Sequence, residues 1–295
     1  MKTLIVIGGP TASGKTNLAI DVANFFQTEI LSVDSRQCFK EMNIGVAKPS
    51  EEQLNSIKHH FINSHSIFEK MSAGIYEQYA TKKLNDIFSK KEIAVCVGGT
   101  GLYIKALCEG IDEMPDVNPE IEQEVNLNYE KYGLAYLQDE IKKQDNLFYQ
   151  TGEIQNPHRL IRALVFKLSI GVSILEYRKN KIKKRDFDID YFAIDIDRTK
   201  LYQHINLRVD FMIQEGLVAE AQSLYPYKHL KPLQTIGYQE LFDFFENKIS
   251  LQQSIDKIKQ HTRNYAKRQS AWFRHQADFH FIEPNYQNII KKLKL

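Results

Sequence analysis

The chain has 295 residues, of which 43% are hydrophobic and 26% are charged, with a formal net charge of +2. This length and apolar content allow a sizeable core to be buried, so the composition excludes a wholly disordered chain. The sequence contains no apolar run long enough to span a membrane, and so small a net charge does not in itself indicate a nucleic-acid partner.

A glycine-rich loop follows the first predicted strand, Leu4–Ile7, and precedes a helix-permissive stretch. The loop fits G-x-x-x-x-G-K-[ST] and consists of Gly9, Pro10, Thr11, Ala12, Ser13, Gly14, Lys15 and Thr16. Between a strand and a helix, this pattern predicts a phosphate cradle, because several backbone N–H groups turn toward an anion at the helix N-terminus. We expect Lys15 to place a charge beside the outer phosphate and Thr16 to offer a hydroxyl to Mg²⁺. The loop does not say which phosphorylated molecule binds, or whether a phosphoryl group moves.

Further strand candidates alternate with helical stretches along the chain. They are Ile30–Val33, His60–Ile62, Ile93–Val97 and Tyr191–Ile196. One intervening helix is expected over 72–89, with Ser72 as its N-cap. This alternation predicts an α/β fold, and with the phosphate loop it indicates a P-loop NTPase-like parallel sheet flanked by helices.

Polar loops follow two of these strands, at the edge where parallel sheets place their chemistry. Asp34, Ser35, Arg36 and Gln37 come directly after Ile30–Val33. Asp34 is a candidate general base or a Mg²⁺ ligand through water, and the structural alternative is a cap for the turn that follows. Thr100 offers a hydroxyl in the glycine-rich loop after Ile93–Val97. Arg208 carries a guanidinium that can reach a phosphate, although it could equally be an ordinary helix-surface arginine.

The composition changes between 112 and 152, where acidic residues dominate. Leu127, Tyr132, Leu134 and Leu137 recur there at helical spacing. The sequence therefore predicts a small all-helical insertion domain at 112–152, which divides a core composed of 1–111 and 153–295.

Two basic segments follow the insertion. The first begins with His158, Arg159, Leu160, Ile161 and Arg162 and runs to Arg185, with Glu176 as its one acid. The second lies on a helix predicted over 250–276, which carries Arg263, Lys267, Arg268 and Arg274 among aromatic residues. Basic side chains with stacking partners suit RNA phosphates and unstacked bases. The alternatives are a solvated helix face and, for Trp272, a core contact.

Taken together, these motifs resemble the tRNA dimethylallyltransferases, also called tRNA isopentenyltransferases. The resembling segments are Gly8–Thr16, Asp34–Pro49, His59–Ile62, Ser72–Ala73, Gly98–Tyr103, Arg159–Leu164, Arg208–Glu220, Thr235–Glu240 and Thr262–Arg274. They occur in the family's order and extend over nearly the whole chain. The resemblance implies transfer of a dimethylallyl group from dimethylallyl diphosphate to N6 of adenine 37, next to the anticodon, in tRNAs that read codons beginning with U. Diphosphate would be released.

The resemblance also implies site roles. The loop Gly9–Thr16 would bind the diphosphate, with Lys15, Arg208 and a Mg²⁺ ion on Thr16 absorbing the charge of the leaving group. Asp34 would take the proton from the adenine amine, and Thr100 would contact the bridging oxygen. The anticodon stem-loop of tRNA would be bound by Asp34, Ser35, Arg36, Gln37, Thr100, His158, Arg159, Leu160, Ile161, Arg162, Arg263, Lys267, Arg268 and Arg274.

Other functions explain parts of the sequence. A P-loop small-molecule kinase that uses ATP would explain the loop and Asp34 equally well, but it would not explain the basic segments. A prenyltransferase acting on free adenine nucleotides is the close enzymatic alternative. A GTPase-like RNA-binding switch is disfavoured because the chain has no N-K-x-D sequence.

Two features of the sequence indicate the cellular compartment: the residues before the first strand and the spacing of the cysteines. The chain enters that strand almost at once, which leaves no room for a signal peptide. Cys38, Cys96 and Cys108 form no C-x-x-C pair, which favours reduced thiols over a disulfide framework or a zinc site. We therefore expect a cytoplasmic protein with neither DNA nor a membrane as a partner, and the family resemblance implies a monomer.

Overall fold

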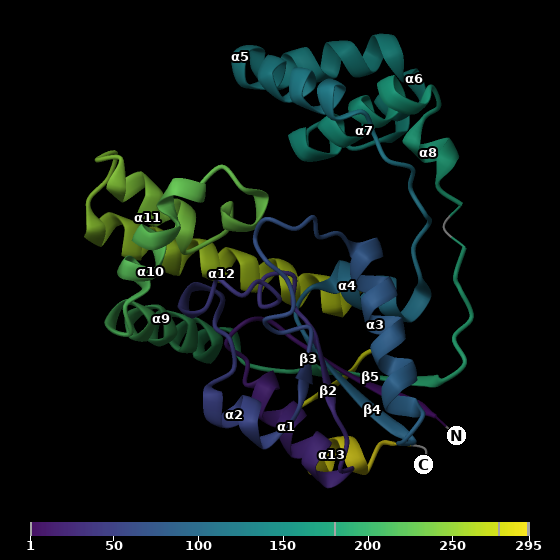
Figure 1. The fold of residues 1–295 in the computed structure, drawn as a ribbon, viewed down its shortest axis with the longest axis vertical. Coiled ribbons are helices and arrows are strands. Elements are labelled where there is room, and N and C mark those ends of the chain that lie inside the picture. The colour runs from purple at the N-terminus through teal and green to yellow at the C-terminus, as the bar shows by residue number, and fades with distance from the viewer. Residues whose placement is uncertain (1, 180, 277, 294–295) are drawn as a thin grey trace. The chain divides into compact units, whose positions relative to one another are not determined.

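The computed structural model describes residues 2–179, 181–276 and 278–293, and the chain divides into two compact units. One unit comprises Met1–Gly110 and Lys184–Leu295, and the other comprises Ile111–Lys183. The ribbon of both units is drawn in Figure 1. Within the described ranges, no helix is both long and apolar enough to cross a membrane.

The larger unit is built on a six-stranded sheet in the order β3-β2-β4-β1-β5-β6, with every neighbouring pair parallel. The strands are β1 (Thr3–Gly8), β2 (Ile30–Val33), β3 (His59–His60), β4 (Ile93–Gly98), β5 (Asp188–Ile194) and β6 (His280–Ile282). All residues of β1 and β4 are buried, as expected for a parallel sheet covered on both faces. The five predicted strands are confirmed: β2 has the predicted bounds, β1 and β4 extend one residue beyond them at one or both ends, and the bounds of β3 and β5 differ more. The sequence analysis missed β6, because three residues with two exposed side chains carry no strand pattern.

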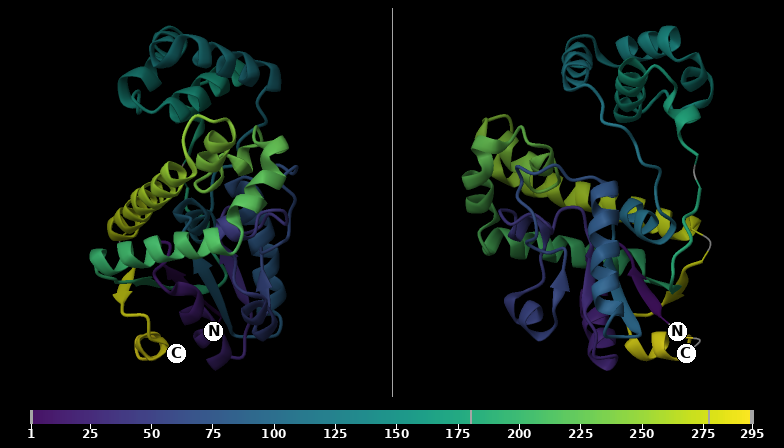
Figure 2. Two further views of the ribbon diagram at one scale, coloured as in Figure 1. Left: turned by 90° about the vertical axis from the view of Figure 1, so that its left-hand side faces the viewer. Right: turned by 45° about the vertical axis from the view of Figure 1, so that its right-hand side comes forward.

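Alternate residues of each strand fill two different cores, one on each face of the sheet. On one face, Leu4 and Val6 pack with α3 (Ala73–Phe88), α4 (Gly101–Glu109) and α12 (Leu251–His275). On the other, Ile5 and Ile7 pack with α1 (Lys15–Phe25) and α13 (Tyr286–Ile290). Figure 2 shows these helices on either side of the strands. The predicted N-cap is confirmed, since the Ser72 side chain accepts a hydrogen bond from the Ile75 N–H.

Further helices complete the larger unit. They are η1 (Ile44–Val46), α2 (Glu51–Ser56), α9 (Arg198–Gln214), α10 (Leu217–Leu224), η2 (Tyr225–Tyr227), η3 (Lys231–Leu233) and α11 (Tyr238–Phe245). The long helix α12 agrees with the prediction over 250–276 to within one residue at each end. Its buried residues are separated by three, four or eight positions, which places them on one face of the helix; they are Ser254, Ile258, Ala266, Gln269 and Phe273. This inner face packs toward the phosphate loop.

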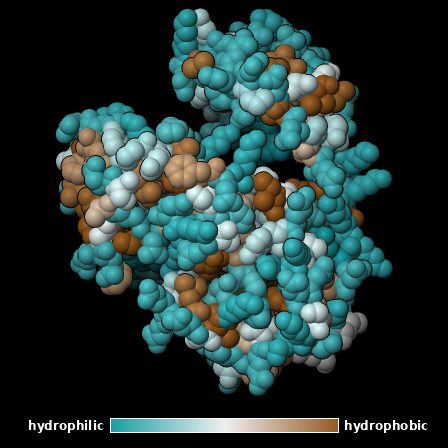
Figure 3. Space-filling view, in the orientation of Figure 1, coloured by the Kyte–Doolittle hydropathy of each residue, from teal (hydrophilic) through white to brown (hydrophobic). Residues whose placement is uncertain are grey.

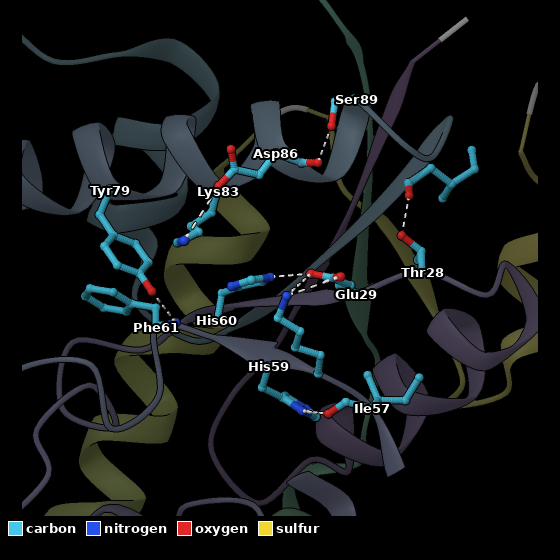
Figure 4. A network of polar contacts seen from close by, with 12 residues as sticks. Thr28, Glu29, Ile57, His59, His60, Phe61, Tyr79, Lys83, Asp86 and Ser89 are labelled. Carbon is cyan, nitrogen blue, oxygen red and sulfur yellow. Dashed lines mark hydrogen bonds and ion pairs between the residues drawn. The ribbon is translucent and has the colours of Figure 1, made fainter. Parts of the chain in front are cut away.

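The edge strand β3 is held by a polar network, which Figure 4 shows. His60 Nε2 lies 2.5 Å from Glu29 Oε2, and Lys58 lies 3.3 Å from the same oxygen. Burial disfavours the charged form of Glu29, but the hydrogen bonds from His60 and Lys58 outweigh it and lower the pKa of the carboxyl. Just beyond β3, the Phe61 N–H donates to the Tyr79 hydroxyl. The network joins the edge of the sheet to α3.

Within the described residues of the smaller unit, all regular secondary structure is helical. Its helices are α5 (Pro119–Gln144), α6 (Asn146–Thr151), α7 (Pro157–Ile170) and α8 (Ile174–Tyr177). Helix α5 is interrupted at Gly133, whose φ of 74° departs from helical geometry. One core joins Leu137 and Ile141 of α5 to Leu160 and Leu164 of α7.

The helical unit is larger than the predicted insertion at 112–152, because it continues to Lys183. The prediction followed the acidic composition, which ends near Gly152. The boundary of the unit instead follows packing, since α7 supplies half of the shared core although its exposed face is basic. The segment 153–183 therefore belongs with the helical unit and not with the second part of the core.

The chain re-enters the larger unit at a buried ion pair. Arg185 Nη2 lies 2.8 Å from Glu77 Oε1 and also donates to the Ala106 carbonyl at 2.9 Å. Buried charges of this kind are costly unless paired. Arg185, the last residue of the first basic run, thus anchors the chain to α3 and α4.

The three cysteines are free, as predicted, and the structure shows that all three are buried. Burial raises the pKa of the Cys38 thiol to about 12, which makes it unreactive. On the face drawn in Figure 3, the surface is mostly hydrophilic and its apolar side chains form scattered groups.

Candidate functional site

The predicted phosphate loop curls between β1 and α1. Gly9, Ala12 and Gly14 have φ values of 152°, 63° and 88°, so the backbone turns sharply three times within six residues. Backbone of this kind directs successive N–H groups to one side, where they form an anion-binding concavity. Inside it, the buried Ser13 hydroxyl has no hydrogen-bond partner within the described chain. A phosphate oxygen would satisfy that hydroxyl.

Positive charge gathers at this loop. Lys15 donates to the Pro10 carbonyl over 3.0 Å. Burial and, to a smaller extent, the nearby Arg208 lower the pKa of Lys15 to about 8, while Asp34 acts in the opposite direction. The positive charges therefore outweigh the single carboxylate, and a bound anion would relieve their repulsion.

Helix α9 brings two side chains to the loop from far along the chain. Arg208 Nη1 donates to Thr11 Oγ1 at 3.4 Å, which places the guanidinium beside the phosphate loop. The ring of His204, one turn earlier, lies 3.3 Å from the Ala12 carbonyl oxygen. His204 was not predicted, because a histidine on a long helix has no local pattern that marks its target.

Asp34 uses its two carboxylate oxygens differently. Oδ1 accepts hydrogen bonds from the N–H groups of Arg36 at 2.8 Å and Gln37 at 3.2 Å. The structural alternative considered for Asp34, a cap for the following turn, is therefore realised by Oδ1. Oδ2 accepts no hydrogen bond from any residue that the structure describes. One oxygen holds the loop in shape, which leaves the other able to accept a proton.

Thr100 lies beside Asp34. The Ser35 N–H donates to Thr100 Oγ1 at 3.2 Å, and the Thr100 N–H donates to the Val33 carbonyl at 3.3 Å. The loops at the ends of β2 and β4 are thus joined. The approach is so close that a Cβ at Gly98 would lie 2.1 Å from the Val33 carbonyl oxygen. Although Thr100 is the N-cap of α4, its side chain caps no N–H group, so helix capping does not explain why a threonine stands at this position.

The hydroxyl of Tyr265, from α12, also interacts with Thr100. Burial and the charge of Asp34 raise the pKa of this phenol to about 12. Tyr265 therefore remains neutral at physiological pH and adds an aromatic wall beside the two loops. The Trp272 ring, two turns later, packs against Gly101, where a Cβ would lie 2.4 Å from it. This contact matches the core alternative considered for Trp272.

The Asp34 loop is held by side chains that the sequence analysis treated differently. Gln37, predicted as a tRNA contact, donates through Nε2 to the Ala47 carbonyl at 2.8 Å. Glu220 of α10, which was not predicted, accepts the N–H groups of Asn43, Ile44 and Gly45 at 2.8–3.1 Å. The Tyr238 hydroxyl donates to the same carboxylate at 2.6 Å. Glu220 thus fixes segment 43–45, just before the carbonyls that hold Gln37.

The basic residues of α12 are not equivalent. Lys267, Arg268 and Arg274 are exposed. Arg263 is half-buried, and its Nη1 donates to Asn206 Oδ1 of α9 at 2.6 Å. The first three side chains are accessible to a ligand without rearrangement, whereas Arg263 already links α12 to α9.

In the helical unit, the predicted tRNA-binding residues of α7 divide into two groups. His158, Arg159 and Arg162 are exposed, and Arg159 forms an ion pair with Glu153. The prediction for Leu160 requires correction, because this side chain is fully buried in the core of the unit. Ile161 is half-buried against the same core. An amphipathic helix presents one face to solvent, so consecutive residues of a motif cannot all contact a ligand through their side chains.

A third arginine lies near Arg162. Burial and the charges of Arg162 and Arg159 lower the pKa of Arg178, which follows α8. Three arginines thus lie near one another on the helical unit, where Asp112 acts on Arg178 in the opposite direction and Glu153 pairs with Arg159.

Comparisons with known proteins agree with this geometry. The family model described as IPP transferase matches residues 37–276. Two curated relatives, called tRNA dimethylallyltransferase, are each 46% identical. The one from Christiangramia forsetii aligns over 97% of this chain and 95% of its own length, and the one from Flavobacterium johnsoniae over 93% and 91%.

Solved structures are also similar. A tRNA isopentenylpyrophosphate transferase from Bacillus halodurans matches with a TM-score of 0.72 at 30% identity, over 99% of this chain and 94% of that one. A eukaryotic dimethylallyltransferase acting on tRNA shares the fold, with a TM-score of 0.75 at 23% identity over 99% of this chain and 76% of its own.

Proposed function

This chain belongs to the IPP transferase family, and on that basis we propose that it transfers a dimethylallyl group from dimethylallyl diphosphate to a tRNA. The acceptor is N6 of adenine 37, beside the anticodon, in tRNAs that read codons beginning with U. The observation that carries the proposal is the meeting of a phosphate loop with Asp34 and Thr100 at one edge of the sheet. A phosphate site and a proton acceptor are the two groups that this reaction needs.

The leaving group is stabilised by the charges around the loop. As the C–O bond of the allylic diphosphate breaks, Lys15, Arg208 and backbone N–H groups receive the negative charge that develops. The allylic carbon tolerates partial positive charge, so this stabilisation lowers the barrier substantially. Thr100 is placed to donate its hydroxyl to the bridging oxygen.

The residues fit a Mg²⁺ ion held mainly by the diphosphate. Thr16 lies in the first turn of α1, directly after Lys15. The described residues contain no group of three His, Cys, Asp or Glu that could hold a metal, and Mg²⁺ typically binds through one protein oxygen, substrate phosphates and water. When bound, the ion would neutralise charge on the diphosphate.

Asp34 acts on the acceptor. The exocyclic amine of adenine is a poor nucleophile, because its lone pair is delocalised into the ring. As N6 bonds to the allylic carbon, Asp34 Oδ2 takes the proton and diphosphate departs, which balances the reaction. General bases of this kind typically contribute about 10²–10⁴ in rate.

The acceptor adenine must leave its stack, at a cost of roughly a few kcal/mol. Contacts from Ser35 and Arg36, from the exposed basic side chains of α12 and from the exposed face of α7 would offset that cost. We further propose that the enzyme works as a cytoplasmic monomer and binds no DNA.

Incubation of the protein with labelled dimethylallyl diphosphate, unmodified tRNA, AMP and ATP tests the proposal. The expected result is label in tRNA alone, at the adenine next to the anticodon. Label in AMP would support the alternative acceptor, and phosphoryl transfer from ATP to a small molecule would support a kinase.

A further inference from the structure

A buried glutamine on α12 joins two of the loops at the site. Gln269 is 7% exposed. Its Oε1 accepts the N–H of Thr11 in the phosphate loop at 2.8 Å, and its Nε2 donates to the carbonyl of Gly99 at 2.9 Å. Both ends of one neutral amide are thus used, one on the loop after β1 and one on the loop after β4.

The surrounding chain leaves room for this amide. A Cβ at Gly99 would lie 2.1 Å from Gln269 Nε2, so a side chain at that position would displace the amide. One turn later, Phe273 packs so closely on Gly8 that a Cβ there would lie 2.3 Å from the ring. The inner face of α12 is therefore seated directly on the ends of β1 and β4.

We propose that Gln269 is a positioning residue for the transfer reaction, which fixes the distance between the diphosphate loop and Thr100. The inference rests on the proposed function. The two loops have different roles, since one holds the diphosphate, whereas the other supplies Thr100, which is joined through the Ser35 N–H to the loop that carries Asp34. A small displacement between such groups can cost a large factor in rate even when tRNA binding is retained.

The chemistry at this position requires a neutral amide. Leucine would leave the Thr11 N–H and the Gly99 carbonyl unpaired in a buried place. Ionised glutamate would keep the contact to Thr11 but would face the Gly99 carbonyl with a second acceptor. Protonated glutamate, in contrast, has one donor and one acceptor in nearly the same positions as glutamine.

The test compares Gln269→Glu and Gln269→Leu with the wild-type enzyme at pH 8 and pH 6. The charged and titratable groups at these loops are Lys15, Arg208 and His204 at the phosphate loop, Asp34 and Arg36 after β2, and Tyr265 and Arg268 on α12. Because these groups titrate in every variant, the rate is expressed as a fraction of the wild-type rate at the same pH. Gln287→Glu, an exposed change on α13, is the charge-matched control.

At pH 8, the Gln269→Glu variant is expected to lose about 10- to 100-fold in kcat, with the KM for tRNA within a few-fold of wild type. At pH 6 its relative kcat is expected to recover about fivefold or more, because burial favours the protonated carboxyl. The Gln269→Leu variant is expected to be impaired at both values. A relative rate that equals wild type, or a loss that does not recover at pH 6, would overturn the proposal.

A second measurement separates this inference from the proposed function. Calorimetry with Mg²⁺ and inorganic diphosphate needs no prenyl transfer, and Gln269→Glu should bind diphosphate about tenfold more weakly at pH 8 than at pH 6, after correction by the wild-type ratio. If diphosphate binding changes between the wild type and Gln269→Glu in this way but the wild type modifies no tRNA, the proposed function fails, and Gln269 still holds the diphosphate loop. If tRNA is modified and neither readout depends on Gln269, the positioning role fails and the function stands.

Discussion

In the larger unit, the charged side chains at the phosphate loop are held by neighbours from distant parts of the chain, whereas in the helical unit Arg162 stands exposed on one helix. Arg208 reaches Thr11 across 197 positions, and Glu220 reaches Gly45 across 175. The difference indicates that the two regions will respond differently to substitution. Changes near the loop should affect the chemical step, and changes on the exposed face of α7 should affect only tRNA affinity.

The most severe test of this comparison is Asp34→Ala. We expect kcat to fall by about 10²–10⁴, because the proton acceptor is removed. The dissociation constant for tRNA, measured by filter binding, should stay within a few-fold. A variant that keeps most of its kcat would show that Asp34 is not the base.

Lys15 tests the electrostatics of the loop. Its pKa of about 8 in the free enzyme means that it is charged below that pH and increasingly neutral above it. A bound diphosphate favours the charged form, so the affinity should fall as the pH rises above 8, and binding near pH 8 should take up a proton. Calorimetry in two buffers with different ionisation enthalpies measures that uptake, which should disappear in Lys15→Ala. An unchanged uptake would place the titrating group elsewhere.

Leu160 and Arg162 sharpen the comparison within a single helix. Leu160→Ala should destabilise the protein by about 2–5 kcal/mol, because it leaves a cavity in the core of the helical unit. Arg162→Ala should leave the melting temperature near its wild-type value and weaken tRNA binding. Thermal melts and tRNA binding, measured on both variants, separate the two roles. Equal melting temperatures for both variants would contradict the assignment of Leu160 to the core.

The smallest expected effect comes from the exposed basic side chains of α12. Replacing Lys267 and Arg268 together by Ala should reduce the slope of log affinity for tRNA against log salt by about one to two units. The affinity for dimethylallyl diphosphate should not change, since separate loops build that site. If the slope is the same as in wild type, this face of α12 is only solvated and the tRNA lies elsewhere.

Short-range patterns were sufficient to predict the central sheet and the residues at its edge. The phosphate loop, Asp34 and Thr100 each follow a buried strand directly, and in a parallel sheet the ends of such strands meet at one edge. These three parts of the site therefore come together once the strands run parallel to one another. The outline of the helical unit could not be predicted in the same way, because composition changes at 152 while the packing of α7 on α5 continues the unit to 183.

Long-range packing was needed to identify the residues that hold the site together. Gln269 contacts Thr11 across 258 positions, and it lies next to Arg268, which faces solvent. Nothing in the local sequence says which of these two polar residues points inward. Whether Gln269 or Arg268 points inward depends on which face of α12 packs on β1 and β4. That packing is decided only once the sheet has assembled. Polar side chains on a long helix acquire their partners from the fold, whereas the phosphate loop carries its geometry in its own glycines.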